Sequence, residues 1–489
     1  MTGFEISRKK LINIFDNVIG KTLGEVDSKN VFQRTIKNPK ITGIAGDIIE
    51  QSVVGYPSDS RQSPDLIVDG IETELKTTGI RKSKKKNDNR FEAKEPMTIT
   101  AVSPERIIYE KFETSSFWHK LENLLLVYYN YDSEQTVPAA RYADFVLEGY
   151  HFYQFSDEDR ERLKNDWVLV RDFLLQLEET ENPVEGYPNL SSALRKDLML
   201  IDTSPKWPNR PRFRLKRSTV TTIVQGYFGE QLEKLDKSYT TFQEVDDKLQ
   251  ELTRVHQGKS IKQLIKELGL PLNLNKSRDV QKAITEQIVV KMFDGNASKM
   301  NQIELFKKIG LIPKSVTQTV KGTRTEDMKL LKIDFGEWTD ESISFEESSV
   351  FSYFNDYQLL CILFEEPDNS AKLLDNKFIG FKRLIIPDYI VDTDVRETWN
   401  KVRHLINNNE LKESRLYNKN GELLINPKTK LTKTSINFPK SKDFLFFVRG
   451  SGTDSSAKTL QVNGIQMYTQ YLWMKGSVLL GMLEDIDYI

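Results

Sequence analysis

Short segments recur along the chain at a nearly constant spacing, and this internal repeat is the strongest constraint on the fold. GKTL at residues 20–23 returns as GKSI at 258–261, 238 positions later, and DIIEQSVV at 47–54 returns as AITEQIVV at 283–290, 236 positions later. Two looser matches keep the same order: Gly70 and Lys76 against Gly310 and Lys314, and the segment from Ser115 against the segment from Ser348. Ordered matches at one offset predict two copies of one domain.

The two predicted copies are each large enough to fold around a core. A chain of 489 residues corresponds to roughly two to four domains of average size, and two large domains would each bury a sizeable core. We predict copies at 1–232 and 258–489, joined by a connecting helix at 233–257. The joining segment has an apolar stripe at helical spacing and no Gly or Pro until Gly258, which is not the composition of a flexible linker.

Charge and composition exclude several classes of protein. The 70 basic and 71 acidic side chains nearly cancel, which excludes a globally basic nucleic-acid binder but not a locally basic one. One cysteine, Cys361, and four scattered histidines argue against a disulfide framework and against a thiolate- or histidine-rich metal site. No apolar run approaches the roughly 20 residues that a bilayer requires. Because the N-terminus also lacks a secretory pattern, we predict a cytoplasmic protein with no membrane partner.

The local sequence pattern predicts a mixed α/β fold. Residues 66–68 and 71–77 have the pattern of two strands around a tight Asp-Gly turn, and 124–129 that of a buried strand. Residues 157–177 keep helical spacing of their apolar side chains and predict an amphipathic helix. Strands and helices are therefore interleaved in the first copy.

Asp65, Glu74 and Lys76 carry the clearest chemistry, in the pattern P-D-x8-E-x-K. Alternate residues of a strand share a face, so Glu74 and Lys76 project together while Leu75 enters the core. A hairpin return brings Asp65 beside Glu74, and two convergent carboxylates suit Mg²⁺. Such an ion polarises a phosphodiester and lowers the pKa of bound water, and the lysine offsets developing negative charge. Glu50, on a preceding helix, is a candidate further carboxylate; an ordinary exposed strand edge is the alternative interpretation.

This pattern, together with motifs on either side of it, resembles the MutH-type GATC endonucleases of the PD-(D/E)xK nuclease fold. The resemblance covers the first copy well and the second copy faintly. The supporting motifs, in the family's order, are GKTLGE at 20–25, GDIIE at 46–50, HKL at 119–121, an acidic helix at 157–167 and FRLK at 213–216.

The resemblance implies an α/β (α+β) fold, a restriction-endonuclease-like mixed sheet flanked by helices and present twice. It implies cleavage of double-stranded DNA at GATC with Mg²⁺, as in a type II restriction-modification system. Asp65, Glu74 and Lys76 form the implied catalytic core. Glu50 and Lys120 complete the implied catalytic set, and the implied metal ligands are the three carboxylates. For Lys120, a solvated lysine beside an apolar strand is the alternative.

Two departures from the family pattern leave assignments open. The family's glycine precedes its catalytic glutamate by two residues, whereas here it precedes Glu74 by four. Glu72 and Asp69 are therefore rival carboxylates, although the lysine two positions after Glu74 favours Glu74. The family's base-reading R-P-K has no clean copy, only SPK at 204–206, so the base-reading residues are undefined.

A basic segment at 206–217 is the strongest candidate for DNA contact. It contains six basic and no acidic residues, with Trp207 and Phe213 interleaved, and such a segment can neutralise phosphates and read guanine edges. The predicted contacts are Lys206, Arg210, Arg212, Arg214, Lys216 and Arg217. A solvated basic loop is the alternative. The RKSKKK run at 81–86 fits a phosphate-contacting loop and a solvated loop equally.

The repeat places apolar residues where the second copy would need carboxylates. The aligned pairs are Asp65 with Leu305, Glu74 with Ile312, Lys120 with Asn355, Glu50 with Glu286 and Lys76 with Lys314. Without the two core carboxylates Mg²⁺ has too few oxygen ligands. We therefore predict a catalytically inactive copy that binds DNA or a second monomer and regulates cleavage. The lysines available for DNA are Lys428, Lys430, Lys433, Lys440 and Lys442.

One active domain per chain implies a homodimer, at least transiently on DNA, because two antiparallel strands must be cut. No nucleotide cofactor is expected, since a phosphate loop needs a glycine five positions before its second one, where Phe15 and Thr253 stand. Two alternatives remain open: a DNA-binding or assembly protein without catalysis, and a nicking repair endonuclease.

Overall fold

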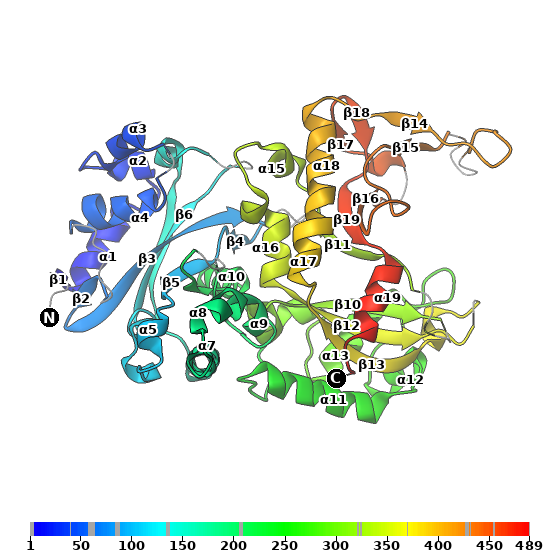
Figure 1. Cartoon of the computed structure of the whole chain (residues 1–489), viewed down its shortest axis with the longest axis horizontal. Helices are drawn as coiled ribbons and strands as arrows, with labels where there is room; N and C mark the ends of the chain where they lie inside the picture. Colours follow the sequence, from blue (N-terminus) through cyan, green and yellow to red (C-terminus); the bar gives the residue numbers. More distant parts are fainter. Residues whose placement is uncertain are drawn as a thin grey trace.

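The computed structural model describes residues 4–39, 41–56, 64–83, 89–133, 137–204, 209–319, 322, 325–368, 370–425, 430, 432–452 and 455–488. Two bodies lie side by side in Figure 1, the first copy running from blue to green and the second from green to red. Within these ranges no helix combines the length and apolar character needed to cross a membrane.

The main sheet of the first copy is mixed, as predicted. Its strands are β1 (Phe4–Ile6), β2 (Leu66–Val68), β3 (Ile71–Lys82), β6 (Leu124–Asn130) and β7 (Leu147–Tyr153), in that order, with β4 (Phe91–Ala93) pairing at the far end of β3. The predicted hairpin is present: Asp69 and Gly70 both have positive φ angles, the geometry that a tight two-residue turn requires. Beside it, β3 and β6 run parallel and β7 returns antiparallel.

A smaller antiparallel sheet completes the first copy. It consists of β5 (Met97–Ala101), β9 (Arg212–Leu215) and β8 (Ile201–Asp202), with β9 in the middle. The predicted amphipathic helix is α7 (Asp157–Glu178), which buries Leu163, Trp167 and Val170. Helix α10 (Arg217–Tyr227) follows β9 directly.

The second copy repeats the smaller sheet and the β3-β6-β7 part of the main sheet, while α14 (Glu304–Lys308) rather than a strand precedes β10. Strands β10 (Leu311–Gln318) and β12 (Gln358–Glu365) are parallel and β13 (Lys377–Leu384) is antiparallel, as in the β3-β6-β7 group. A second sheet of β11 (Met328–Lys332), β19 (Gln470–Met474) and β16 (Phe446–Gly450) matches the β5-β9-β8 group, and α19 (Gly476–Glu484) follows its middle strand. The expected duplicated α/β fold is confirmed.

The repeated GKT and GKS segments have a structural role that is the same in both copies. Thr22 and Ser260 each begin a short helix, α2 (Leu23–Val26) and α12 (Ile261–Glu267), with a reciprocal capping box. The preceding glycines donate their backbone N–H groups to Leu147 and Phe378, in each case over 2.8 Å. Each segment therefore ties a helix start to the antiparallel strand of its copy, which satisfies backbone groups at the helix terminus.

The remaining elements connect these sheets. In the first copy they are α1 (Arg8–Asp16), η1 (Val31–Gln33), α3 (Arg34–Lys37), α4 (Ile44–Ile48), η2 (Ile49–Val54), α5 (Pro104–Ile107), η3 (Phe112–Thr114), α6 (Ser116–His119), η4 (Ala139–Asp144), α8 (Pro183–Gly186), η5 (Tyr187–Asn189) and α9 (Leu190–Leu194). In the second they are α11 (Phe242–His256), α13 (Ile284–Met292), η6 (Met300–Gln302), α14 (Glu304–Lys308), α15 (Phe335–Thr339), η7 (Phe345–Glu347), α16 (Ser349–Asp356), η8 (Leu373–Asp375), α17 (Asp388–Ile390), η9 (Val391–Val395), α18 (Arg396–Asn407), β14 (Glu413–Arg415), β15 (Thr434–Ile436), η10 (Ser455–Ala457), β17 (Leu460–Val462) and β18 (Ile465–Met467).

Helix α11, expected as a connector, packs on strand β13 of the second copy. Arg383 on that strand bonds Asp246 on α11 through two nitrogens, at 3.0 and 2.5 Å. Helix α1 stands in the equivalent place of the first copy, where Asp16 accepts a hydrogen bond from Tyr150 on β7. The helix thus covers the second sheet rather than spanning free space, and the domain boundaries at 232 and 258 remain predictions.

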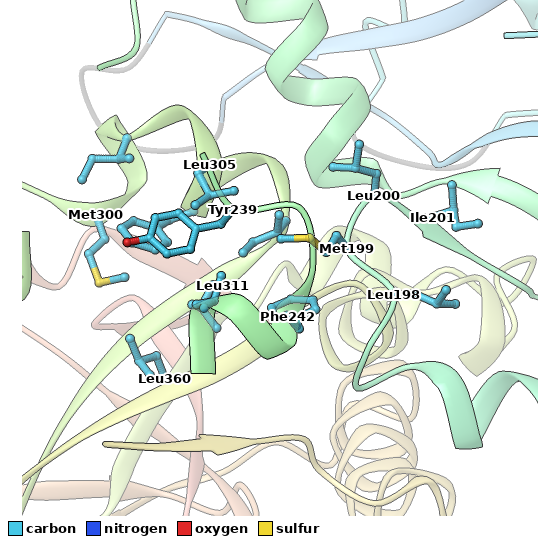
Figure 2. Packing of buried hydrophobic residues seen from close by; sticks show 14 of the residues in the cluster. Leu198, Met199, Leu200, Ile201, Tyr239, Phe242, Met300, Leu305, Leu311 and Leu360 are labelled. Atoms are coloured by element: carbon cyan, nitrogen blue, oxygen red, sulfur yellow. The ribbon is translucent and has the colours of Figure 1, made fainter. Parts of the chain in front are cut away.

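The two copies share a continuous apolar core. Figure 2 shows Met199 of the first copy near Phe242 of the second, with Leu198 and Leu200 to one side and Leu311 to the other, and all five belong to one buried cluster. Polar contacts also cross the junction, among them an ion pair of 2.6 Å between Arg195 and Asp388. Separating the copies would therefore expose apolar surface, so tests of function need the full chain.

Candidate active site

Strand β3 places Glu74 and Lys76 on one face, as the alternation of a strand predicts. Their side chains form an ion pair of 2.8 Å between Oε1 and Nζ, while Leu75 between them is buried in the core. The Glu74 side chain is only 1% exposed. Its charge is therefore held away from water, where ionic contacts are strong.

Lys120 reaches the same carboxylate from another part of the chain. Its Nζ lies 2.9 Å from Oε1 of Glu74. The residue directly follows helix α6, whose start is capped by the Ser115 hydroxyl, and it stands four residues before the strand that runs parallel to β3. In that pairing Glu74 lies opposite Leu124, the first residue of β6. The parallel register therefore delivers Lys120 to Glu74, and the alternative of a solvated lysine does not fit its 8% exposure.

Asp65 lies just before β2, where the hairpin return brings it to the same end of β3. One of its carboxylate oxygens accepts a hydrogen bond from the backbone N–H of Leu75 over 3.2 Å. Burial and the neighbouring Glu74 carboxylate raise the pKa of Asp65 to about 6. Its rival Asp69 lies in the hairpin turn and accepts from the backbone of Arg8 instead. The geometry favours Asp65.

Glu50 approaches this group from a helical segment on the same side. It lies in η2, a π-helical turn that continues α4, and such turns are frequent at functional sites. Burial raises the pKa of Glu50 to about 7, and the Asp65 and Asp47 carboxylates add to the shift. Asp47, which the sequence pattern singled out only as part of the GDIIE motif, lies three residues before Glu50 on the same helix face and forms an ion pair of 2.6 Å with Arg34.

Glu72, the rival of Glu74, occupies the same face of β3 but lies outside the site. Its side chain is 53% exposed and lies 3.7 Å from His119. Glu74 is buried between two lysines, so the geometry favours Glu74 for the central position.

The donor set at this site fits a hard divalent cation. Oε2 of Glu74 is buried and has no hydrogen-bond partner among the described residues, which is costly unless a charge or donor meets it. The described part of the chain contains no group of three or more Asp, Glu, His or Cys side chains that could hold a metal by itself. Mg²⁺ needs few protein ligands, because it keeps several waters and commonly takes substrate phosphate oxygens. Asp65 and Glu74 are the two carboxylates best placed for it.

The basic segment expected at the DNA is only partly exposed. Lys206 lies outside the described residues. Arg210 and Arg212 are exposed, and Arg210 contacts Ser103 and Glu105. Arg214 forms a two-pronged ion pair with Asp202, at 2.8 and 3.0 Å.

Lys216 and Arg217 lie deeper in the structure. Lys216 is 2% exposed and donates to the backbone carbonyl of Leu198, and burial lowers its pKa. Arg217 donates to the carbonyl of Ala93. This placement does not favour DNA contact by Lys216, because it is a core residue that satisfies a backbone carbonyl.

The corresponding site in the second copy is apolar. Leu305, aligned with Asp65, is buried in the shared core (Figure 2), and Ile312 packs against the second core cluster. Lys314 donates to the carbonyl of Lys329 over 2.7 Å, and burial lowers its pKa to about 8. Glu286 accepts from the backbone of Met300. The carboxylate pair that could hold a metal in the first copy has no equivalent at these positions.

Comparison with known proteins places this geometry in context. Residues 54–166 match the family model of the DNA mismatch repair enzyme MutH. The chain carries a MutH-like domain. The matched range contains Asp65, Glu74, Lys76 and Lys120, and it begins four residues after Glu50. The whole chain is similar to the type II restriction enzyme Sau3AI of Staphylococcus aureus, with 22% identity over 411 residues that cover 81% of this chain and 79% of that enzyme. The MutH-like domain therefore stands within a longer likeness that extends into both copies.

Proposed function

We propose that this chain is a site-specific endonuclease that hydrolyses double-stranded DNA at GATC with Mg²⁺, as part of a type II restriction-modification system. The observation that carries the proposal is the meeting of Lys76 and Lys120 at one oxygen of the buried Glu74, beside Asp65. This group lies inside the range that matches the MutH family model. The long likeness to a type II restriction enzyme supports the restriction role.

Each residue of the site has a definite task in this proposal. Asp65 and Glu74 would hold the cation. Glu50, whose carboxyl group feels the charges of both, would help to hold a second cation. When bound, the cation polarises the scissile phosphate and lowers the pKa of coordinated water. Hydrolysis joins a water oxygen to phosphorus and breaks one ester P–O bond, and the leaving oxygen takes up a proton. Lys76 and Lys120 orient the water and the phosphate and offset the negative charge that develops on phosphorus.

DNA binding also requires exposed basic side chains that can contact the phosphates on either side of the scissile bond. Arg210 and Arg212 are exposed on and beside β9 and are the described residues of the basic segment best placed to meet phosphates. The GATC sequence is palindromic, so one active domain per chain implies a dimer on DNA, symmetric about the site.

The second copy is proposed to be catalytically inactive and to act through binding. Its apolar residues at Leu305 and Ile312 leave too few oxygen ligands for Mg²⁺. It shares a core with the first copy, so a ligand held by the second copy can influence the first through packed contacts. Its proposed roles are to hold DNA or a second monomer and thereby to regulate cleavage.

One incubation tests the proposed activity. The full chain is mixed with Mg²⁺ and a supercoiled plasmid that contains GATC, and in parallel with a plasmid from which every GATC has been removed. Linear product and defined fragments from the first plasmid alone are expected. Nicked product without linear DNA would instead indicate a repair-type endonuclease, which the MutH description keeps as the second candidate. Binding without any cleavage would contradict the endonuclease proposal and indicate a silent DNA-binding protein.

A further inference from the structure

A two-stranded arm, described at residues 411–425, 430 and 432–437, projects from the second copy. Strands β14 and β15 pair antiparallel, with Arg415 opposite Thr434. The two-stranded pairing ends where Leu416 donates its backbone N–H to Lys433. Beyond it the chain makes two separate turns, in which Tyr417 bridges Leu423 and Ile425 bridges Thr432. In Figure 1 the arm extends away from the body at the upper right of the molecule.

The arm is an addition to the repeated fold. In the first copy the chain between α7 and β8 forms α8, η5 and α9, and Leu190 and Leu194 from this stretch are buried in the core. In the second copy the corresponding stretch, between α18 and β16, forms the arm. Its buried apolar side chains are Leu411 and Phe438, at or next to its base. Apart from its base, the described part of the arm adds no buried side chain to the core, and a two-stranded ribbon alone is at best marginally stable in water.

The arm carries a concentrated positive charge. Residues 411–437 include six basic and two acidic side chains, a net charge of 6 − 2 = +4, whereas the whole chain has a net charge of −1. Both acidic groups are engaged within the arm, Glu413 by the Thr434 hydroxyl and Glu422 by the Asn418 amide. The described basic residues are all exposed, and none forms an ion pair with another described residue: Lys412, Arg415, Lys419, Lys430 and Lys433.

Exposed apolar side chains stand among these cations. Tyr417 and Ile425 are 57% and 53% exposed. A two-stranded ribbon fits the major groove of B-DNA, where apolar side chains can contact thymine methyl groups and cations meet the flanking phosphates. The charge of the arm therefore favours an acidic partner, and its shape favours a groove.

We propose that the arm is a DNA-binding ribbon that grips the duplex outside the cleavage site. The inference rests on the proposed function in one respect, that double-stranded DNA is the substrate. It assigns the binding role of the second copy to one element. A second copy of this chain is the other candidate occupant, but two arms of net charge +4 repel each other.

The test removes charge from the arm without touching the catalytic residues. The triple variant Arg415→Gln/Lys419→Gln/Lys433→Gln is compared with Lys262→Gln/Lys266→Gln/Lys276→Gln, which removes the same charge from exposed positions elsewhere in the second copy. Binding to a fluorescent duplex with a central GATC is measured by anisotropy without divalent metal, over a series of salt concentrations. Circular dichroism melts and sedimentation check the fold and the oligomeric state.

The two variants are expected to differ in salt dependence. Each lost phosphate contact lowers the slope of log affinity against log salt by roughly 0.9, so the arm variant should lose about 2 to 3 from the slope and the control variant should not. Equal slopes for both variants would overturn the proposal. A changed oligomeric state with an unchanged slope would also overturn it and would assign the arm to a second copy of the chain. These readouts need no cleavage, so they separate failure of this inference from failure of the proposed activity.

Discussion

The ammonium groups of Lys76 and Lys120 meet at one atom, Oε1 of Glu74, at 2.8 and 2.9 Å. The other oxygen of this carboxylate is buried and has no hydrogen-bond partner in the described part of the structure. One oxygen thus meets two positive charges, while the other is buried without a described partner in a group whose charge also acts on Asp65. The proposed chemistry needs both oxygens of Glu74. Oε1 fixes the two lysines that would contact the phosphate, and Oε2 is left to bind the cation.

Equivalent lysines of the two copies should have unequal importance. Lys76→Met removes a charge beside Glu74, so cleavage of the GATC plasmid should fall by about a hundredfold, the usual cost of losing one preorganised electrostatic group. Lys314→Met removes a half-buried lysine that bonds a backbone carbonyl, so it should lower the melting temperature and leave the rate per folded molecule unchanged. Comparable losses of rate in both variants would contradict the assignment of one active site to the first copy.

Lys120 is expected to act in the reaction rather than in DNA binding. Lys120→Met should slow single-turnover cleavage by about a hundredfold and change the affinity for the duplex little. Lys111→Met, an exposed position on the preceding loop, is the matched control and should cleave as the parent does. A loss of affinity that fully accounts for the loss of rate would show that Lys120 binds substrate only.

Two basic residues of the DNA segment should respond in opposite ways. Arg212 is exposed, so Arg212→Gln should weaken DNA binding and leave thermal stability unchanged. Lys216 is buried, so Lys216→Gln should lower the free energy of unfolding by about 3 kcal/mol, as breaking a buried charged contact does. Anisotropy and thermal melts measure the two effects. Loss of DNA affinity in a fully stable Lys216→Gln protein would place this lysine at the DNA after all.

The junction between the copies should make stability depend on pH through Asp356. This residue ends α16 and is 3% exposed, and one of its oxygens lacks a hydrogen-bond partner among the described residues. Burial raises the pKa of Asp356 to about 7, and the Asp202 carboxylate adds to the shift. The folded state therefore holds a proton that the unfolded chain releases near its ordinary value of 3.8. The bound proton of Asp356 stabilises the folded state fully below pH 3.8, and this contribution is lost as the pH rises through about 7.

Removing this ionisable group should flatten the profile. The melting temperature of the parent protein should fall between pH 5 and about 8, and that of Asp356→Asn should fall less, by a few degrees. Asp443→Asn, at an exposed position, serves as the control. A parent profile that rises over this range while both variants follow it would contradict the buried, protonated state of Asp356.

Local patterns allowed much of the fold and site to be predicted, and long-range contacts explain what was missed. The hairpin, the shared face of Glu74 and Lys76 and the duplication follow from short-range periodicity and repetition. The contact between Lys120 and Glu74 depends on a parallel strand register, and it was reached through resemblance alone. The burial of Lys216 could not be predicted, because a basic run looks the same in sequence whether its partners are phosphates or a backbone carbonyl of the same protein.

The positions of α11 and of the arm also depend on long-range contacts that the sequence does not reveal. The apolar stripe of α11 was correctly taken as a packing face, but its partner, strand β13, lies more than a hundred residues further along the chain. The arm at 411–437 was visible in sequence only as scattered lysines. Its ribbon geometry and its exposure come from the three-dimensional structure.

The most direct test of the central claim compares two glutamates on one face of β3. Initial rates of GATC plasmid cleavage with saturating Mg²⁺ are measured for the parent chain, Glu74→Gln and Glu72→Gln. The buried Glu74 is proposed to hold the cation, so Glu74→Gln should lose about a hundredfold or more in rate, roughly 3 kcal/mol of barrier, while still binding the duplex. The exposed Glu72→Gln should cleave nearly as the parent does. Full activity in Glu74→Gln, or loss of activity in Glu72→Gln alone, would contradict the account.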